Sequence, residues 1–437
     1  MFKMGCAKAD VTPSWKTYIR GYASRNRLTD EIEEPIEVGV IALEQDGVKS
    51  LIITCDMVGI EFTDSKKIYK AVYERTGINY PNIFLSSSHT HFAPAFTGYI
   101  IYTNGGELPL GEQPADEKYY AFWLDKMLAA AEHAIADMEE VELLQAYIPV
   151  SSVAFNRRTV QKSDGMVKTN YTYPDNADDY NFSDIDTTLH VWKFMSGTHP
   201  KAVLARYGCH PVTGGRNGYG ISADYPGYFK QAVQEKLGCP GFFMLGTAGD
   251  VVPIRRHNKS RQDIGEVLAN SIRLAERTFR KTTDFEFKSA NAMLKVNAPA
   301  LVGKSAEEVD KIWRDALEEA KNSSDYSNKF YMAGMLWAVY QDYKSSETVL
   351  PVQLMQLGDR TLVGLPFEVL TIIGKKIREV FPDAAVVSCT GGYEGYLPMK
   401  EDFPKGGYEA TGGTILAEDT GDNIVATAIA ALKEFGK

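Results

Sequence analysis

Two pairs of short, almost entirely apolar segments constrain this fold more than any other feature of the sequence. Residues 38–43 and 51–55 flank an Asp-Gly turn, and residues 352–357 and 361–365 flank a Gly-Asp turn. Such turns between apolar runs are typical of β-hairpins. Apolar residues at successive positions, rather than at every second one, indicate strands that are covered on both faces. The sequence therefore predicts an α/β fold of layered mixed β-sheets flanked by helices.

The other predicted elements alternate along the whole chain. Strands are expected to end at His89 and to occupy 140–155, 202–209, 241–245 and 384–389, with helices at 63–76, 116–138, 225–237, 262–281, 306–321, 328–343, from about Pro366, and at 422–435. Residues 162–185 are polar and predict an exposed loop. No internal repeat is visible. We therefore expect one large domain over residues 1–437, with a helical hairpin at about 303–345 as an insertion or lid.

The composition argues against several classes of protein. The 437 residues carry a formal net charge of -10 and a pI near 5.4, without the surplus of Lys and Arg that nucleic-acid binding requires. The five cysteines are scattered and form no Cys-x-x-Cys, a pattern typical of a reducing compartment. With no apolar signal segment and no run of about 18 apolar residues, we expect a cytoplasmic protein without a transmembrane segment. A secreted mature form with its signal trimmed stays open, as does the oligomeric state.

His89 and His91 follow the apolar residues 83–85 at the end of a predicted strand. In an extended backbone, residues two apart project from the same face, so both imidazoles can point into one cavity. Zinc binds neutral imidazole nitrogens at about 2.0–2.1 Å, and a catalytic zinc keeps three protein ligands and one open position. On spacing alone both histidines are candidate zinc ligands. The alternative is a hydrogen-bonded polar strand end.

Three further polar groups lie where predicted strands or turns end in loops. His210 follows a strand, Glu368 stands at a strand-to-helix junction, and Tyr396 lies in the glycine-rich segment 391–413. Functional groups collect at such places because a rigid sheet positions the connections. A third imidazole and a carboxylate would complete a catalytic zinc set. The simpler alternatives are a core histidine at 210 and, at 368, an acid that favours the first turn of a helix.

Several short motifs occur in a fixed order along the chain. They are Lys8-Ala9-Asp10-Val11-Thr12-Pro13, Gly21-Tyr22-Ala23, Ser88-His89-Thr90-His91, Asn156-Arg157, His210, Gly249-Asp250-Val251-Val252-Pro253, Pro366-Phe367-Glu368, Tyr393-Glu394-Gly395-Tyr396 and Tyr408-Glu409-Ala410. This ordered set resembles the N-terminal catalytic domain of the neutral (non-lysosomal) ceramidase family, of which the chain would be a divergent member. The resemblance extends over nearly the whole length and implies a metal-dependent hydrolase of linear amides, with a role in lipid metabolism.

The resemblance also implies roles for individual residues. His89, His210, Glu368 and Tyr396 would hold one zinc ion per chain. His91 would then be a catalytic group rather than a ligand, which differs from the interpretation based on spacing alone. Tyr396 could instead act as a catalytic donor to the oxyanion. Arg157 and Tyr408 would bind the polar head of the substrate or the transition-state oxyanion.

Three differences from the family bear on the expected substrate. Val252 replaces a loop serine that contacts substrate in the family, and a valine side chain forms no hydrogen bond. The chain also stops where family members continue into an immunoglobulin-like domain, and many of those members are secreted. We therefore expect a zinc-dependent hydrolase of an amide bond in an N-acylated small molecule or lipid other than ceramide. The alternatives are a metal-dependent esterase, a carbohydrate-active enzyme, or a non-catalytic ligand-binding homologue.

Overall fold

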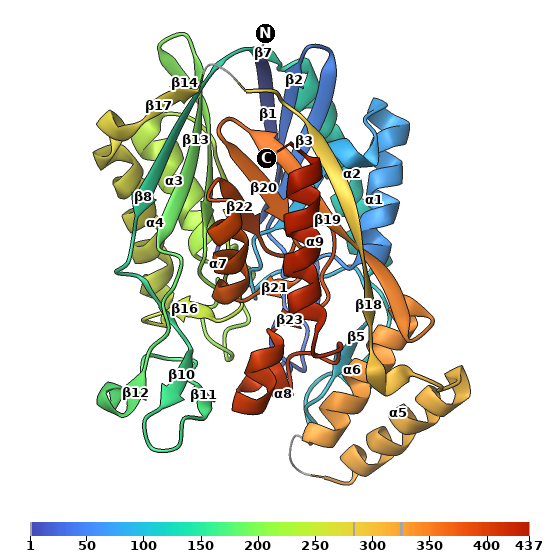
Figure 1. The fold of residues 1–437 in the computed structure, drawn as a ribbon. Coiled ribbons are helices and arrows are strands. Elements are labelled where there is room, and N and C mark those ends of the chain that lie inside the picture. The colour runs from blue at the N-terminus through green and yellow to red at the C-terminus, as the bar shows by residue number, and fades with distance from the viewer. Residues whose placement is uncertain (1, 283–284, 324–326, 437) are drawn as a thin grey trace.

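The structure of the chain, a computed structural model, describes residues 2–282, 285–323 and 327–436 (Figure 1). It is a mixed α/β fold in which three large sheets pack together and helices cover their outer faces, as predicted. Within the described ranges, no helix has the length and apolar character needed to cross a lipid bilayer.

The first four strands of each large sheet are arranged in the same order, a repeat that the sequence did not reveal. The first sheet has the order β4-β3-β2-β1-β7, built from β1 (Phe2–Asp10), β2 (Glu37–Gln45), β3 (Val48–Cys55), β4 (Ile83–Ser87) and β7 (Glu139–Glu140). The second has the order β15-β14-β13-β8-β17, built from β8 (Glu142–Pro149), β13 (Thr188–Ser196), β14 (His199–Tyr207), β15 (Gly241–Leu245) and β17 (Arg280–Thr282). The third has the order β18-β19-β20-β22, built from β18 (Ser289–Asn297), β19 (Glu347–Leu357), β20 (Arg360–Gly364) and β22 (Ala384–Val387).

In each sheet, three antiparallel strands are followed by a fourth strand that adds in parallel. Both predicted hairpins, β2 with β3 and β19 with β20, are confirmed. A helix links the parallel strands of each sheet, since parallel neighbours require a crossover: α1 (Phe62–Thr76), α3 (Tyr225–Leu237) and α7 (Thr371–Val380). A longer helix follows each fourth strand: α2 (Glu117–Ala136), α4 (Asn258–Leu274) and α9 (Thr420–Glu434). The chain thus contains three modules of like topology.

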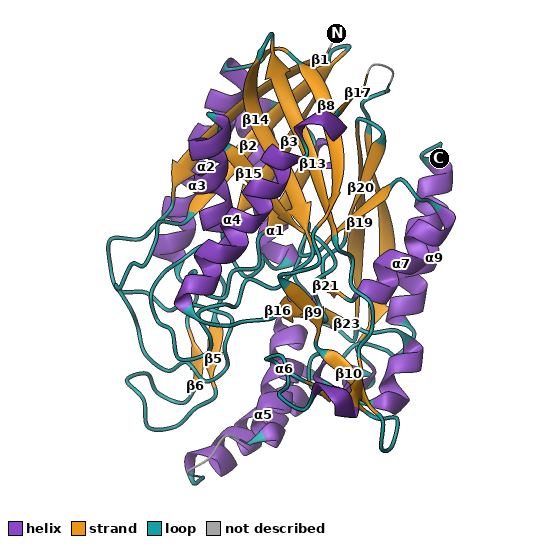
Figure 2. Ribbon diagram, turned by 90° about the vertical axis from the view of Figure 1, so that its left-hand side faces the viewer, coloured by secondary structure: helices purple, strands orange, loops and turns teal. Residues whose placement is uncertain are grey.

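The inner faces of the three sheets meet in one apolar core. Ile52 of β3 lies in this core with Trp192 of the second sheet and Leu362 of the third. Its neighbours Leu51 and Ile53 point the opposite way, into a second cluster formed with helices α1 and α2. Because successive side chains of a strand point to opposite faces, and both faces are covered, the strands are apolar at nearly every position. Figure 2 shows helices α2, α3 and α4 over the strands.

Three sequence predictions need correction. The helix expected from Pro366 begins only at Thr371, and Glu368–Val369 instead form strand β21, which pairs in parallel with β23 (Tyr396–Leu397). The helix expected at 262–281 is α4, which ends at Leu274, because the residues that follow leave it to pair as β17 with β8. The predicted loop at 162–185 contains the short strands β11 (Val167–Thr169) and β12 (Tyr180–Asn181). Both pair with β10 (Arg158–Gln161), which lies just before the loop.

The two helices predicted after residue 303 are confirmed as α5 (Ala306–Lys321) and α6 (Asn328–Tyr343). Ser305 and Glu308 form the expected capping box at the start of α5. The pair extends from the end of the molecule at which the strands run into loops (Figures 1 and 2). The remaining short elements are β5 (Tyr99–Ile101), β6 (Gly111–Gln113), β9 (Ala154–Asn156), β16 (Val251–Pro253), α8 (Tyr408–Thr411) and 3-10 turns at 80–82, 177–179, 276–278, 299–301 and 400–405.

Candidate metal centre and adjoining pocket

The three modules each deliver one polar side chain to the same place. His89 follows β4 of the first sheet, His210 follows β14 of the second, and Glu368 follows β20 of the third. All three are almost completely buried. His89 also has a left-handed backbone with φ of 66°, which is unusual for a residue other than glycine and is characteristic of constrained functional sites. The ends of three separate strands therefore converge on one buried cluster.

Glu368 is the centre of this cluster. Its Oε2 lies 2.9 Å from Nε2 of His210 and 3.2 Å from Nε2 of His89. Its Oε1 accepts a hydrogen bond of 2.7 Å from the hydroxyl of Tyr393. In the parallel pair β21–β23, Glu368 lies opposite Tyr396, whose hydroxyl is 3.4 Å from Nε2 of His210. The structure thus brings together the four residues predicted as zinc ligands.

The backbone fixes the orientation of two imidazole rings. Nδ1 of His89 lies 2.5 Å from the carbonyl oxygen of Val58, and Nδ1 of His210 contacts the carbonyl oxygens of Ala248 and Val251. A carbonyl can only accept, so each Nδ1 is the donor, and in a neutral ring each Nε2 then presents a lone pair. Both lone pairs face the Glu368 carboxylate, itself an acceptor. These converging acceptor atoms repel one another unless a proton or a cation lies between them.

His91 has different surroundings. Its Nε2 lies 3.2 Å from Nε2 of His89, and the ligand-capable atoms of His89, His91 and His210 all lie within 4.8 Å of one another. Its Nδ1 is buried and has no hydrogen-bond partner among the residues that the structure describes. Gly21 packs against this ring so closely that a Cβ at residue 21 would lie 2.6 Å from Cβ of His91. His91 therefore reaches the cluster but lacks the backbone acceptor that holds the other two rings.

The charges of the cluster compensate one another. Burial lowers the pKa of His210 to about 4, although Glu368 acts in the opposite direction. Burial would also lower the pKa of His89, but Glu368 and Cys389 together outweigh it and raise that pKa well above its ordinary value. Burial, reinforced by the two neighbouring rings, holds the pKa of His91 well below its ordinary value. A single positive charge between His89 and Glu368 is therefore what this cluster favours.

The donor set fits a zinc ion. Imidazole nitrogens and a carboxylate oxygen are the atoms that zinc binds in hydrolases, and ligands at about 2.0–2.1 Å in a tetrahedron are about 3.3 Å apart. The separations from Glu368 Oε2 to the Nε2 atoms of His210 and His89, 2.9 and 3.2 Å, are close to that value. The Nδ1 contacts with backbone carbonyls are the outer hydrogen bonds that metal-bound histidines usually make. The buried histidine cluster can therefore hold a metal ion.

Arg157 and Tyr408 lie beside this cluster. The guanidinium of Arg157 lies 5.2 Å from the centroid of the Tyr396 ring, and the rings of Tyr396 and Tyr408 are 5.4 Å apart. Arg157 Nε donates a hydrogen bond of 2.6 Å to Glu409, which also pairs with Arg158 at 3.1 Å. Arg157 Nη2 is buried without a hydrogen-bond partner within the described part of the chain. The second group of predicted site residues thus adjoins the first.

Asp250 connects the surrounding loops. Its carboxylate accepts hydrogen bonds from Asn156 Nδ2 at 2.8 Å, from Thr371 N at 2.9 Å and from Thr371 Oγ1 at 2.8 Å. Its carbonyl oxygen accepts the N–H of Arg157 at 2.7 Å. This one aspartate therefore ties the strand that precedes Arg157 to the start of α7, just after Glu368.

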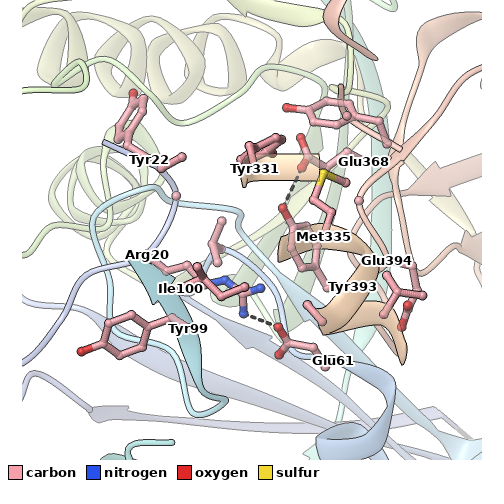
Figure 3. A pocket seen from close by; sticks show the side chains of 18 of the residues that line it. Arg20, Tyr22, Glu61, Tyr99, Ile100, Tyr331, Met335, Glu368, Tyr393 and Glu394 are labelled. Carbon is pink, nitrogen blue, oxygen red and sulfur yellow. Dashed lines mark hydrogen bonds and ion pairs between the residues drawn. The ribbon is translucent and has the colours of Figure 1, made fainter. Parts of the chain in front are cut away.

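A pocket of about 290 Å³ opens beside the cluster and is lined in part by His91, Glu368 and Tyr396. Helix α6 forms one wall through Tyr331, Met335 and neighbouring residues, so the helical hairpin covers the site (Figure 3). Val252 contributes no polar group. Its side chain is fully buried, in a small apolar cluster with Phe155 and Val212.

Sequence reasoning missed several residues of this site. The carbonyls of Val58 and Ala248 have no sequence signal, because any residue supplies a carbonyl. Arg20 and Glu61, which form an ion pair in the pocket, lie in segments without a motif. Glu409 could have been found, since it follows Tyr408 in a motif that the sequence analysis quotes, and a buried arginine requires a partner.

Comparison with known proteins identifies similar folds among solved structures. The chain matches no known family model and no curated protein sequence. It does have the fold of solved ceramidases. The neutral ceramidase from Pseudomonas aeruginosa superimposes with a TM-score of 0.72 and 16% sequence identity, over 99% of this chain and 75% of that chain. A structure described as ceramidase complexed with C2 gives a TM-score of 0.73 at 16% identity with the same coverage. The resemblance predicted from the ordered motifs is thereby confirmed as a divergent neutral-ceramidase fold.

Proposed function

We propose that this chain is a zinc-dependent hydrolase that cleaves an amide bond in an N-acylated small molecule or lipid other than ceramide. The observation that carries the proposal is the meeting of two imidazole Nε2 atoms and a carboxylate oxygen, which repel one another when both rings are neutral. A bound cation resolves that repulsion. The neutral-ceramidase fold supports the reaction class, because the compared protein is named for cleaving an N-acyl lipid.

His89, His210, Glu368 and Tyr396 would hold one zinc ion. When bound, zinc lowers the pKa of water toward about 7 and polarises a carbonyl. His91 faces the same space, its Nδ1 has no hydrogen-bond partner among the described residues, and its lowered pKa keeps the ring neutral. A neutral imidazole accepts a proton, so we assign to His91 the transfer of a proton from the attacking water to the leaving amine.

The groups that stabilise negative charge are Arg157, Tyr396 and Tyr408. Attack on an amide carbonyl produces an oxyanion, which pre-organised donors stabilise in a site that excludes water. Burial raises the pKa of the Tyr396 and Tyr408 hydroxyls well above the ordinary value, so an uncoordinated hydroxyl stays a donor. Nη2 of Arg157, which has no hydrogen-bond partner in the described part of the chain, adds a further N–H.

Two observations favour a substrate other than ceramide. Val252 is buried in an apolar cluster and supplies no hydrogen bond at the position of the family serine. The pocket, at about 290 Å³, is near the lower end of the roughly 300–1,000 Å³ typical of small-molecule sites. It therefore suits one compact group better than two long hydrocarbon chains.

Metal analysis and a substrate screen test the proposal. We expect about one zinc per chain after gentle purification. His89→Ala and His210→Ala should each lose the metal and all turnover, whereas His199→Ala, at an exposed histidine, should change neither. A protein that gains no activity with zinc, or that keeps its turnover in either ligand variant, would contradict the assignment. Faster cleavage of matched esters or glycosides than of amides would favour the esterase or carbohydrate-active alternative, and tight binding without turnover would favour the non-catalytic one.

A further inference from the structure

Eight of the 24 residues that line the pocket beside the metal centre are tyrosines. The lining tyrosines come from both ends of the chain. They include Tyr18, Tyr22 and Tyr99 from the N-terminal part and Tyr331, Tyr393 and Tyr408 from the C-terminal part. Figure 3 shows Tyr22, Tyr99, Tyr331 and Tyr393 placed around one space. A tyrosine ring offers a flat apolar face and a hydroxyl that both donates and accepts. Such rings suit a ligand that has both C–H faces and hydroxyls.

An ion pair projects into the same space. Arg20 Nη1 donates hydrogen bonds to Glu61 Oε1 and, at 3.1 Å, to Thr97 Oγ1. The Arg20 and Glu61 side chains are 28% and 14% exposed, so a ligand can reach both. The guanidinium also lies 5.6 Å from the centroid of the Tyr393 ring, whose hydroxyl donates to Glu368. Figure 3 shows the ion pair between Tyr99 and Tyr393. The Arg20 guanidinium can donate to one ligand hydroxyl, and the Glu61 carboxylate can accept from an adjacent one.

Acidic side chains outnumber basic ones among the residues that line the pocket. Besides Glu61, the lining includes Asp342 and Glu394, while Arg20 is already paired. Glu394 accepts a hydrogen bond of 2.8 Å from the Tyr343 hydroxyl. A carboxylate or phosphate on the ligand would lie beside these acids while Arg20 is already paired with Glu61, whereas neutral hydroxyls can form hydrogen bonds with a carboxyl.

We propose that this pocket binds a neutral, hydroxyl-rich group, such as a sugar ring or a polyol, that carries the N-acyl group. Arg20 and Glu61 bind adjacent hydroxyls, and the tyrosine rings pack against the C–H faces. The orientation of the ligand in the pocket depends on the proposed function, because hydrolysis requires the amide to lie next to Glu368 and His91. Binding of the hydroxylated group does not depend on turnover, so the two proposals can be tested separately.

Calorimetric titration of the zinc-loaded protein tests the inference with four probes. N-acetylglucosamine and its reduced, open-chain alcohol carry the hydroxyls, N-hexylacetamide carries the amide on an apolar chain, and N-acetylglucosamine 6-phosphate adds an anion. We expect N-acetylglucosamine or its alcohol to bind at least about tenfold more tightly than N-hexylacetamide, and the phosphate to bind more weakly than its parent sugar. Equal or tighter binding of N-hexylacetamide or of the phosphate would overturn the inference.

Variants of the ion pair locate the binding site. Arg20→Lys and Glu61→Gln should each weaken the hydroxylated probe by about tenfold or more, because each removes part of a charge-assisted hydrogen-bond pair. Their effect on N-hexylacetamide should be smaller, and their zinc content should stay at the wild-type level. Arg75→Met and Glu132→Gln, in a surface ion pair of 3.6 Å whose side chains are each 46% exposed, are matched controls and should not change binding. Equal weakening of both probes would overturn the assignment.

Turnover measurements separate the two proposals. Tight, ion-pair-dependent binding of N-acetylglucosamine without hydrolysis of any amide would support the pocket assignment and contradict the hydrolase. Zinc-dependent hydrolysis of N-hexylacetamide at least as fast as that of the sugar amide, with no tighter sugar binding, would support the hydrolase and overturn the pocket assignment.

Discussion

Glu368 and Tyr396 lie opposite each other in the parallel pair β21–β23, so a carboxylate and a phenol 28 residues apart share one short sheet. The pairing explains why residues 366–369 are extended instead of helical. Glu368 N–H donates to the carbonyl of Gly395, and helix α7 starts only at Thr371, whose N–H donates to Asp250. This local structure delivers Glu368 to His89 and His210.

Glu368→Gln should abolish metal binding while leaving the protein folded. The amide keeps the size of the side chain but removes the negative charge that faces the two Nε2 atoms. Since loss of an outer partner already costs about 10–100-fold in metal affinity, we expect a loss above about 100-fold. Competition with a zinc chelator measures the affinity. Glu347→Gln, at an exposed acid of β19, is the matched control, and tight zinc binding by the Glu368 variant would contradict the site.

Tyr393→Phe should weaken the metal without removing it. The variant deletes only the hydroxyl that donates to Glu368 Oε1 at 2.7 Å, so the carboxylate becomes less well oriented. We expect the zinc affinity to fall by about 10–100-fold, with a lesser effect on thermal stability. Tyr173→Phe, at an exposed tyrosine, should have no effect on zinc affinity. An unchanged affinity in Tyr393→Phe would show that the hydroxyl does not support the ligand.

Glu409→Ala should destabilise the fold. Glu409 is completely buried and pairs with Arg157 at 2.6 Å and with Arg158 at 3.1 Å, so its removal leaves two buried guanidinium groups without this carboxylate. Breaking a buried pair from one side costs about 3–5 kcal/mol. Urea unfolding followed by circular dichroism measures the loss. Glu401→Ala, at an exposed acid of the same region, is the control. A loss below about 1 kcal/mol would contradict this role.

Glu34→Gln should stabilise the protein at alkaline pH. Burial, with some contribution from Asp224, raises the pKa of Glu34 from 4.5 to about 8. Below pH 4.5 the carboxyl is neutral in both the folded and the unfolded chain. Between pH 4.5 and 8 it ionises only in the unfolded chain, so wild-type stability falls as pH rises. Above pH 8 the cost is at most about 5 kcal/mol, because one pKa unit corresponds to about 1.36 kcal/mol.

Glutamine has no such ionisation, and its side-chain oxygen can still accept the hydrogen bond that Ser222 Oγ donates to Glu34 at 2.6 Å. The gain in melting temperature over wild type should therefore be larger at pH 9 than at pH 5. Glu31→Gln, at an exposed neighbour, should give equal changes at both pH values. A gain that does not depend on pH would exclude a raised pKa at Glu34.

The sequence predicted the strands and the positions of the site residues better than it predicted their contacts. The apolar runs at 38–43 and 51–55 were sufficient for a hairpin, because burial on both faces leaves a direct mark on composition. Their positions at the ends of strands made His210 and Glu368 candidates, but only the ordered motifs linked them to each other, since no local pattern shows that residues 158 positions apart meet. The carbonyl of Val58 could not be predicted, because its role depends on where the backbone passes.

The repeated topology has a consequence for the response to metal loss. His89, His210 and Glu368 each belong to a different module, and a cation held by all three would act as a crosslink at the centre of the molecule. Its removal should therefore speed hydrogen exchange in the strand ends of all three modules together, rather than in the loops of one. The ion would then stabilise the packing of the three modules as well as take part in the reaction.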